Sequence, residues 1–139
     1  MFYLDTNTCI YFLNGTHPAV RQHLLACRPA EIIIPAIVKA ELLYGALRSQ
    51  RRDENLETVH QFLQPFSVVE FGDAESIHYA EIRRELERHG RPIGPNDLII
   101  ASVARANGAT LVTHNMTGFQ RVPQLSVVDW TMDGDIGAT

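Results

Sequence analysis

The chain has 139 residues, a formal net charge of −4, 45% hydrophobic and 20% charged residues, which is the composition of a single globular domain. No apolar run approaches the roughly 18 residues that span a bilayer. The first residues lack the basic and apolar segments of a secretory signal. Two cysteines without CxxC spacing favour reduced thiols in the cytoplasm, and the acidic balance argues against DNA binding by the whole surface.

Short apolar runs alternate with helical patterns along the chain. The runs predict buried parallel strands and an edge strand, at Phe2–Asp5, Glu31–Pro35, Ser67–Phe71, Thr110–Thr113 and, at the edge, Ser126–Asp129. The spacing predicts helices over residues 8–14, 18–27, 36–48, 51–63, 73–89 and 95–107. Thr6 or Asn7 is expected to cap the first helix, and Asp73 the fifth. Such alternation favours an α/β fold whose mostly parallel sheet is covered on both faces.

Three carboxylates stand in sequence that otherwise resembles a protein core. Asp5 ends the first apolar run, Glu41 lies inside an apolar helical segment, and Asp97 opens another. No arginine lies in these three segments. Since an unpaired buried carboxylate is strongly unfavourable, the three acids together predict a bound divalent cation. Each acid alone could equally be a helix cap or a satisfied, partly buried ion.

The expected topology brings these acids to one cleft, because ligands of open α/β sheets bind outside the carboxyl ends of the strands. Mg²⁺ and Mn²⁺ prefer oxygen ligands and leave coordination positions open to phosphate and water. Such a site serves phosphodiester hydrolysis. The three acids together are therefore the candidate metal-binding and catalytic residues.

Polar side chains accompany the acids at the same edge. Thr6 and Asn7 follow Asp5, and Thr113 and Asn115 leave the fourth strand, so we expect the first three to support the site and Asn115 to help position it. The histidines show no HExxH spacing, which argues against zinc.

The basic residues are almost all arginines, and several cluster along the chain. Arg83, Arg84 and Arg91 are candidates for contacts with RNA phosphates. The competing interpretation is that these clusters are solvated helix faces.

Four ordered motifs resemble those of PIN-domain ribonucleases, and within them the VapC toxins of type II toxin–antitoxin pairs. The motifs are LDTN at Leu4–Asn7, AELLYGA around Glu41, GRPIGPND at Gly90–Asp97 and VTHN at Val112–Asn115. The resemblance covers residues 2 to 130. It implies a three-layer α/β/α sandwich over residues 1–131. The tail at 132–139 carries no signal for a helix or strand, so we expect it to be mobile.

The resemblance implies that Asp5 and Asp97 bind the metal and that Glu41 is an acidic catalytic residue. It also implies an activity and partners. It implies an Mg²⁺- or Mn²⁺-dependent endoribonuclease in the cytoplasm, a homodimer, and a cognate antitoxin that blocks the cleft. Operator DNA would be bound only through the antitoxin, and no membrane is involved. The long GRPIGPND form resembles members that cut the anticodon stem-loop of initiator tRNA.

One position departs from the family pattern. Gly118 occupies the place before Phe119 where family members usually carry a fourth acid, so any second metal site is expected to be weakened. This departure keeps open a catalytically weakened protein that acts by binding its antitoxin and operator DNA. A phosphatase or phosphate-receiver protein is the other alternative, although Asn7 stands where a phosphatase of the haloacid-dehalogenase type needs its second aspartate.

Overall fold

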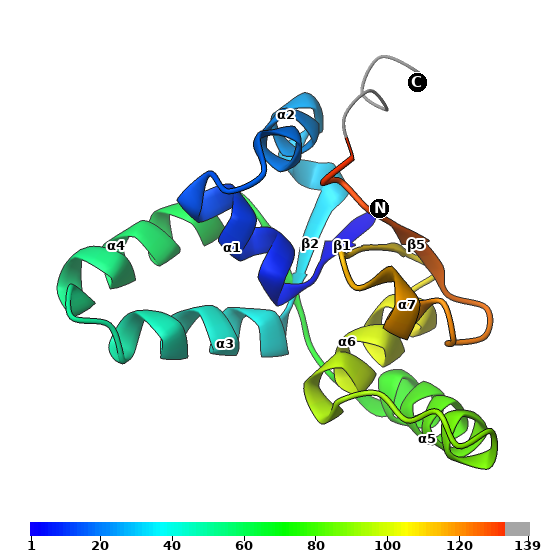
Figure 1. Ribbon diagram of the computed structural model, residues 1–139. Helices are drawn as coiled ribbons and strands as arrows, with labels where there is room; N and C mark the ends of the chain where they lie inside the picture. The colour runs from blue at the N-terminus through cyan, green and yellow to red at the C-terminus, as the bar shows by residue number, and fades with distance from the viewer. Residues whose placement is uncertain (133–139) are drawn as a thin grey trace.

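A five-stranded sheet forms the centre of the computed structural model, which describes residues 1–132 (Figure 1). The strands are β1 (Phe2–Leu4), β2 (Ile32–Pro35), β3 (Ser67–Val69), β4 (Thr110–Val112) and β5 (Ser126–Val128). They run in the order β3-β2-β1-β4-β5, and every neighbouring pair is parallel. The predicted parallel sheet is confirmed, including the edge position of the fifth strand.

Helices cover both faces of this sheet. They are α1 (Thr6–Asn14), α2 (Pro18–Ala26), α3 (Ala36–Leu47), α4 (Arg52–Leu63), α5 (Asp73–Arg88), α6 (Pro95–Ala106) and α7 (Met116–Phe119), with a 3₁₀ turn at Pro29–Glu31. Figure 1 shows α1 to α4 on one side of the sheet and α5 to α7 on the other. The expected three-layer α/β/α architecture is therefore confirmed.

Burial follows from this layering. Ile34 of β2 and Leu111 and Val112 of β4 are fully buried, because helices shield both faces of the central strands. Helix α6 is buried along most of its length, as its apolar sequence predicts. It begins with Pro95 in the first turn, and Gly108 just beyond its end adopts a φ of 62°.

Two predicted helix caps are wrong. Asp5 itself caps α1, since its carboxylate accepts a hydrogen bond from the Thr8 N–H at 2.9 Å. Gly72 is the residue before α5, and its N–H donates to Glu75 at 2.9 Å. Thr6 and Asp73 are instead the first residues of their helices. The carboxylate that ends β1 therefore also fixes the start of α1.

The predicted mobile tail lies, apart from Met132, outside the described residues. Among the described residues, no helix combines the length and the apolar character needed to cross a bilayer.

Candidate active site

The strand order reverses between β1 and β4, and the acidic site lies at that point. After β1 the chain forms β2 and then β3 on one side of it. The chain then returns to form β4 on the other side of β1. The crevice beyond such a reversal is the usual ligand site of an open α/β sheet. Asp5 stands at its mouth, and its N–H donates to Val112 O at 3.1 Å.

Asp5 is the most enclosed of the acids. Its side chain is only 5% exposed. Burial raises the pKa of the Asp5 carboxyl, and the negative charge of Asp129 adds to the rise, while hydrogen bonds from Thr113 and Thr8 oppose it. The site thus holds a carboxylate whose charged form lacks a cationic partner among the described residues.

Asp97 lies in the first turn of α6 and is partly buried. Burial raises the pKa of its carboxyl first, and the charges of Asp5 and Glu41 raise it further, while a hydrogen bond from Asn115 lowers it. Mutual repulsion of this kind requires proximity, because the charge interaction falls off with distance. Asp97 therefore lies close to both Asp5 and Glu41.

Glu41 is held from two sides. The Thr6 hydroxyl donates to Oε1 at 2.6 Å, and the Asn96 amide donates to Oε2 at 3.1 Å. Both carboxylate oxygens are therefore oriented by neighbours of the other two acids, since Thr6 follows Asp5 and Asn96 precedes Asp97. Asn96 was missed from the sequence, where only its place beside Asp97 could have indicated its role.

Asn115 and Thr113 shape the turn that leaves β4. The Asn115 N–H donates to the Thr113 hydroxyl at 3.0 Å, and the Asn115 side-chain oxygen accepts from the Gly118 N–H at 3.2 Å. Asn115 thereby caps α7 while its amide reaches Asp97. Asn7 is exposed and lines a groove of about 500 Å³ together with Thr6 and Glu41.

A further carboxylate, Asp129, ends β5 at the same edge and was not among the predicted site residues. It accepts from the Thr131 N–H at 2.8 Å and from the Thr131 hydroxyl at 2.7 Å, and His114 Nδ1 lies 2.9 Å from it. Burial works to raise its pKa, but these hydrogen bonds outweigh burial and lower it. The signal in the sequence was an acid at the end of a strand, the same feature that marks Asp5.

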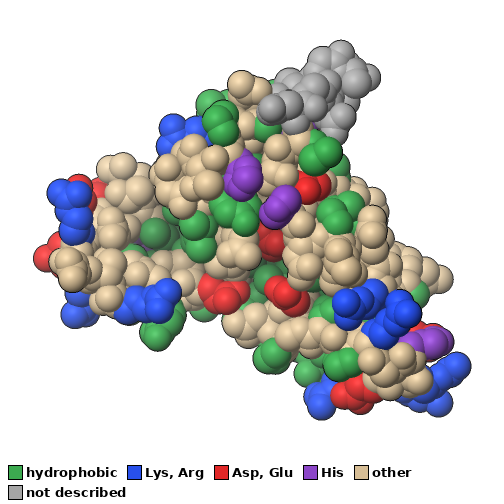
Figure 2. All heavy atoms as spheres, viewed as in Figure 1, with side chains coloured by type: hydrophobic (Ala, Val, Ile, Leu, Met, Phe, Trp, Pro, Cys, Tyr) green, Lys and Arg blue, Asp and Glu red, His purple; other side chains and the backbone are tan. Residues whose placement is uncertain are grey.

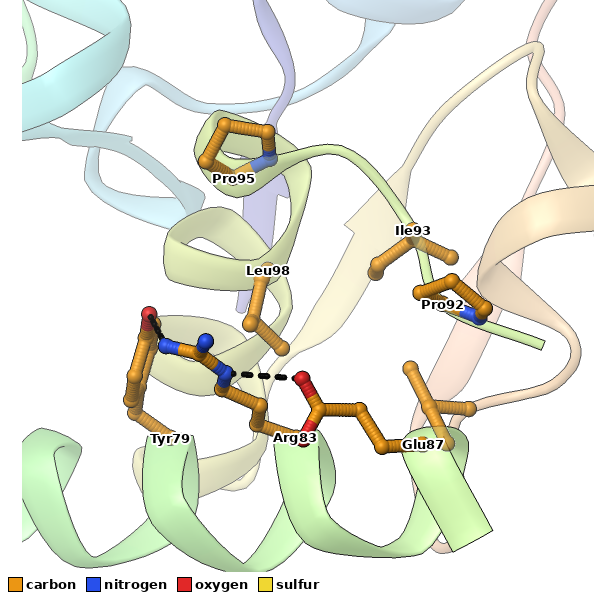
Figure 3. Close-up of a pocket in the computed structure, with 8 residues that line it drawn as sticks. Tyr79, Arg83, Glu87, Pro92, Ile93, Pro95 and Leu98 are labelled. Carbon is orange, nitrogen blue, oxygen red and sulfur yellow. Dashed lines mark hydrogen bonds and ion pairs between the residues drawn. The ribbon is translucent and has the colours of Figure 1, made fainter. Parts of the chain in front are cut away.

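The three predicted arginines do not form one surface. Arg83 donates to Glu87 at 3.1 Å and to Tyr79 at 3.2 Å, within a pocket of about 210 Å³ between α5 and the start of α6 (Figure 3). Arg84 is exposed on α5. Arg91 lines a different hollow, together with Arg121. Arg83 is thus engaged within its own helix.

The donor set suits a hard divalent cation. Asp97 lies close to two other carboxylates, and Figure 2 shows acidic side chains gathered in the middle of this face. Among residues 1–132, no three histidine, cysteine, aspartate or glutamate side chains already stand at metal-binding spacing. The repulsion of Asp97 by Asp5 and by Glu41 is the observation that fits a cation, because a positive charge beside Asp97 would offset it.

Asp97→Asn is expected to stabilise the metal-free protein. The raised pKa means that the folded state favours protonated Asp97, so stability is greatest below the ordinary value of 3.8 and is lost as the pH rises through the raised pKa. Asparagine removes this loss and should raise Tm by roughly 2–4 °C at neutral pH in EDTA. Thermal melts from pH 3 to pH 8 should show the two proteins diverging as the pH rises. A variant that melts lower than the native chain at pH 7 would contradict this electrostatic account.

A side chain at position 118 is expected to disturb Asn115. A Cβ built on Gly118 would lie 2.7 Å from Nδ2 of Asn115, so the amide that reaches Asp97 must move. Gly118→Ala should therefore lower RNA cleavage by about tenfold, as the loss of a supporting partner does. Gly118→Glu adds the missing acid together with the same Cβ, so it tests the second metal site by comparison with Gly118→Ala. A Gly118→Glu variant with the same Mg²⁺ affinity and rate as Gly118→Ala would show that the missing acid is irrelevant.

The Gly118→Ala prediction has an internal control in Asn115→Ala. If the substitution acts only through the Asn115 amide, Gly118→Ala should cause no additional loss in the Asn115→Ala background. Additive losses would mean that position 118 acts by another route.

Comparisons with known proteins agree with this geometry. The PIN domain family matches residues 2–125. Ribonuclease VapC2 of Rickettsia felis is 39% identical over 131 residues, covering 94% of this chain and 98% of the relative. The tRNA(fMet)-specific endonuclease VapC of Shigella flexneri is 37% identical, with coverage of 94% and 98%.

Solved structures give the same result. VapBC2 from Rickettsia felis, bound to a DNA fragment from its promoter, contains a chain that superimposes with a TM-score of 0.84 at 40% identity, covering 94% of this chain and 99% of that one. DNA-bound VapBC from Salmonella typhimurium gives a TM-score of 0.87 at 36% identity, with coverage of 93% and 97%. Sequence motifs, sheet order and acidic cleft all lead to one conclusion: the chain belongs to the PIN-domain family, among the VapC ribonucleases.

Proposed function

We propose that this chain is the toxin of a type II toxin–antitoxin pair and acts as an endoribonuclease that depends on Mg²⁺, with Mn²⁺ able to substitute. The observation that carries the proposal is the proximity of Asp97 to Asp5 and Glu41, whose charges raise the pKa of the Asp97 carboxyl. Asp5 and Asp97 would hold the cation. When bound there, a divalent cation would stabilise charge on the phosphate and make a water easier to deprotonate.

The side chains around the proposed cation have separate roles. Glu41 is oriented by Thr6 and Asn96, which leaves its carboxylate fixed to accept a proton from the attacking water. Asn115 holds Asp97 by its amide, and Thr113 fixes the turn that carries Asn115. The enclosure of Asp5 keeps bulk water from screening the charges in the cleft.

Transfer RNA is the proposed substrate, with the anticodon stem-loop of initiator tRNA as the proposed target. Support comes from two relatives, of Shigella flexneri and Salmonella typhimurium, which are tRNA(fMet)-specific endonucleases at 37% and 36% identity. Both are matched over nearly their whole length. The GRPIGPND motif ends at Asp97, so the segment that resembles these relatives leads directly into the cleft.

The proposed partners are a cognate antitoxin and a second copy of this chain, in the cytoplasm. Support comes from the similar VapBC structures, two of them bound to DNA, so operator DNA would be bound through the antitoxin. An apolar groove of about 290 Å³ lies beside Glu41 and is lined by Ile10 and Leu42 among others. Antitoxin covering this groove would close the approach to Glu41.

The alternatives raised by the sequence are not favoured. Membership of the PIN family leaves a phosphatase or phosphate-receiver protein without support. A protein that only binds antitoxin and operator DNA would not need Glu41 oriented at both oxygens.

The test is cleavage of purified initiator tRNA and elongator methionine tRNA by the protein freed of its antitoxin, with Mg²⁺, with Mn²⁺ and with EDTA. We expect one discrete pair of fragments from initiator tRNA with either metal and none with EDTA. Equal cleavage of both tRNAs would overturn the target, and cleavage in EDTA would overturn the metal dependence. If the folded protein cleaves neither tRNA, the result would favour a protein that only binds antitoxin and operator DNA.

A further inference from the structure

Two arginines from separate segments meet in one hollow beside the acidic cleft. Arg91 follows the turn after α5, and Arg121 follows α7. Both line a space of about 730 Å³ together with the polar side chains of Thr117 and Gln120. Arg121 Nη1 also lies 3.5 Å from Pro92 O, which brings the two segments side by side.

Among residues 1–132, neither guanidinium has a carboxylate partner. Some arginines there form ion pairs, such as Arg83 with Glu87 at 3.1 Å and Arg105 with Glu81 at 2.6 Å, whereas Arg91 and Arg121 belong to those that form none. In a chain of net charge −4, unpaired cations that share one hollow are a local exception. Two like charges facing the same space repel each other and are stabilised by an anion between them.

Two short segments of the chain connect the hollow to the acidic cleft. Arg91 begins the segment that leads to Asp97 at the start of α6, and Asn115, whose amide reaches Asp97, caps the helix that carries Thr117. Figure 2 shows Lys and Arg side chains next to the acidic ones on this face. A ligand could therefore contact both sites at once.

We infer that Arg91 and Arg121 together bind a backbone phosphate of the RNA other than the one that is cut, and so determine which phosphodiester bond lies against Asp5, Glu41 and Asp97. This inference rests on the proposed nuclease function. The guanidinium fork matches phosphate oxygens, and Thr117 and Gln120 supply further hydrogen-bond donors. Phosphate contacts of this kind fix the register of a nucleic acid rather than read its sequence.

Binding measurements separate this inference from catalysis. In the Asp5→Asn background, the Arg91→Ala/Arg121→Ala double variant should raise the Kd for initiator tRNA roughly tenfold or more, as expected when charged hydrogen bonds are lost. The slope of log Kd against log salt concentration should become shallower by about 1 or more. With Asp5 intact, KM for cleavage should rise while kcat stays within about twofold.

A matched control removes two other exposed arginines, Arg51 and Arg52 at the start of α4. Among the described residues only Arg51 forms an ion pair, with Glu54 at 3.0 Å, and such a surface pair contributes little to stability. The Arg51→Ala/Arg52→Ala variant should bind and cleave tRNA as the native chain does. An equal loss in this control, or a loss in kcat alone, would overturn the inference. So would an Arg91→Ala/Arg121→Ala protein that loses antitoxin binding while tRNA binding stays unchanged, because the hollow would then belong to the antitoxin.

The outcomes also distinguish the two proposals. A native chain that binds tRNA through Arg91 and Arg121 but never cleaves it would sustain this inference and overturn the nuclease. A chain that cleaves tRNA with metal, unaffected by the double variant, would sustain the nuclease alone.

Discussion

Asp5→Asn and Asp97→Asn are each expected to lower RNA cleavage by at least 10²–10³-fold, on the order of the loss seen when one preorganised electrostatic group is removed from an active site. Both residues are proposed to hold the cation, and an amide cannot supply the negative charge that attracts it. The measurement is kcat on initiator tRNA at saturating Mg²⁺.

Asparagine is the substitution of choice because it separates catalysis from folding. Asp5 caps α1 through the Thr8 N–H, and asparagine caps a helix about as well as aspartate, whereas alanine costs about 1 kcal/mol. Circular dichroism and thermal melting should therefore show a folded Asp5→Asn protein. An inactive variant that is also unfolded would assign Asp5 a structural role instead.

Glu41→Gln is expected to lower kcat by about 10²-fold, at the lower end of the contribution of a general base. Thr6→Val removes the hydroxyl that donates to Oε1 at 2.6 Å and should cost about tenfold, as loss of a supporting hydrogen bond does. The rates at saturating metal are measured for the native chain, for both single variants and for the double variant. These four rates complete a double-mutant cycle.

The cycle tests whether Thr6 acts through Glu41. If it does, Thr6→Val should add little in the Glu41→Gln background, because the group that it orients is already disabled. Fully additive losses would show that Thr6 contacts the cation or the RNA by itself.

The sheet and most helices were predictable because their signals are local. Each apolar run that predicted a strand forms one, and the alternation with helices required a parallel sheet. The short helix α7 and the 3₁₀ turn at Pro29–Glu31 were not predicted, since a helix of four residues carries no hydrophobic period. The caps were misplaced because Asp5 and Thr6 are both good cap residues, and only backbone geometry separates them.

The acids of the site were predictable because charge inside an apolar sequence is itself informative. Asp97 lies close to both Asp5 and Glu41. The partners that orient them were harder to identify. Asn96 and Asp129 reach the site through long-range contacts, with Glu41 and across the sheet edge, for which the sequence carries no spacing.

Which arginines could contact RNA was likewise hard to predict from the sequence. Arg83 lies one turn before Glu87, a spacing that predicts an ion pair within the helix rather than a free cation. Arg121 gains significance only because α7 folds back beside Arg91. Charge clusters along the sequence therefore did not identify the convergence of Arg91 and Arg121.

The central claim is that Asp5, Glu41 and Asp97 form a divalent cation site, and calorimetric titration of the protein with Mn²⁺ tests it most directly. We expect binding to the native chain, loss of binding in Asp97→Asn, and unchanged binding in Asp53→Asn, a control at the start of α4. Affinity for Mn²⁺ that is the same in Asp97→Asn as in the native chain would contradict the account.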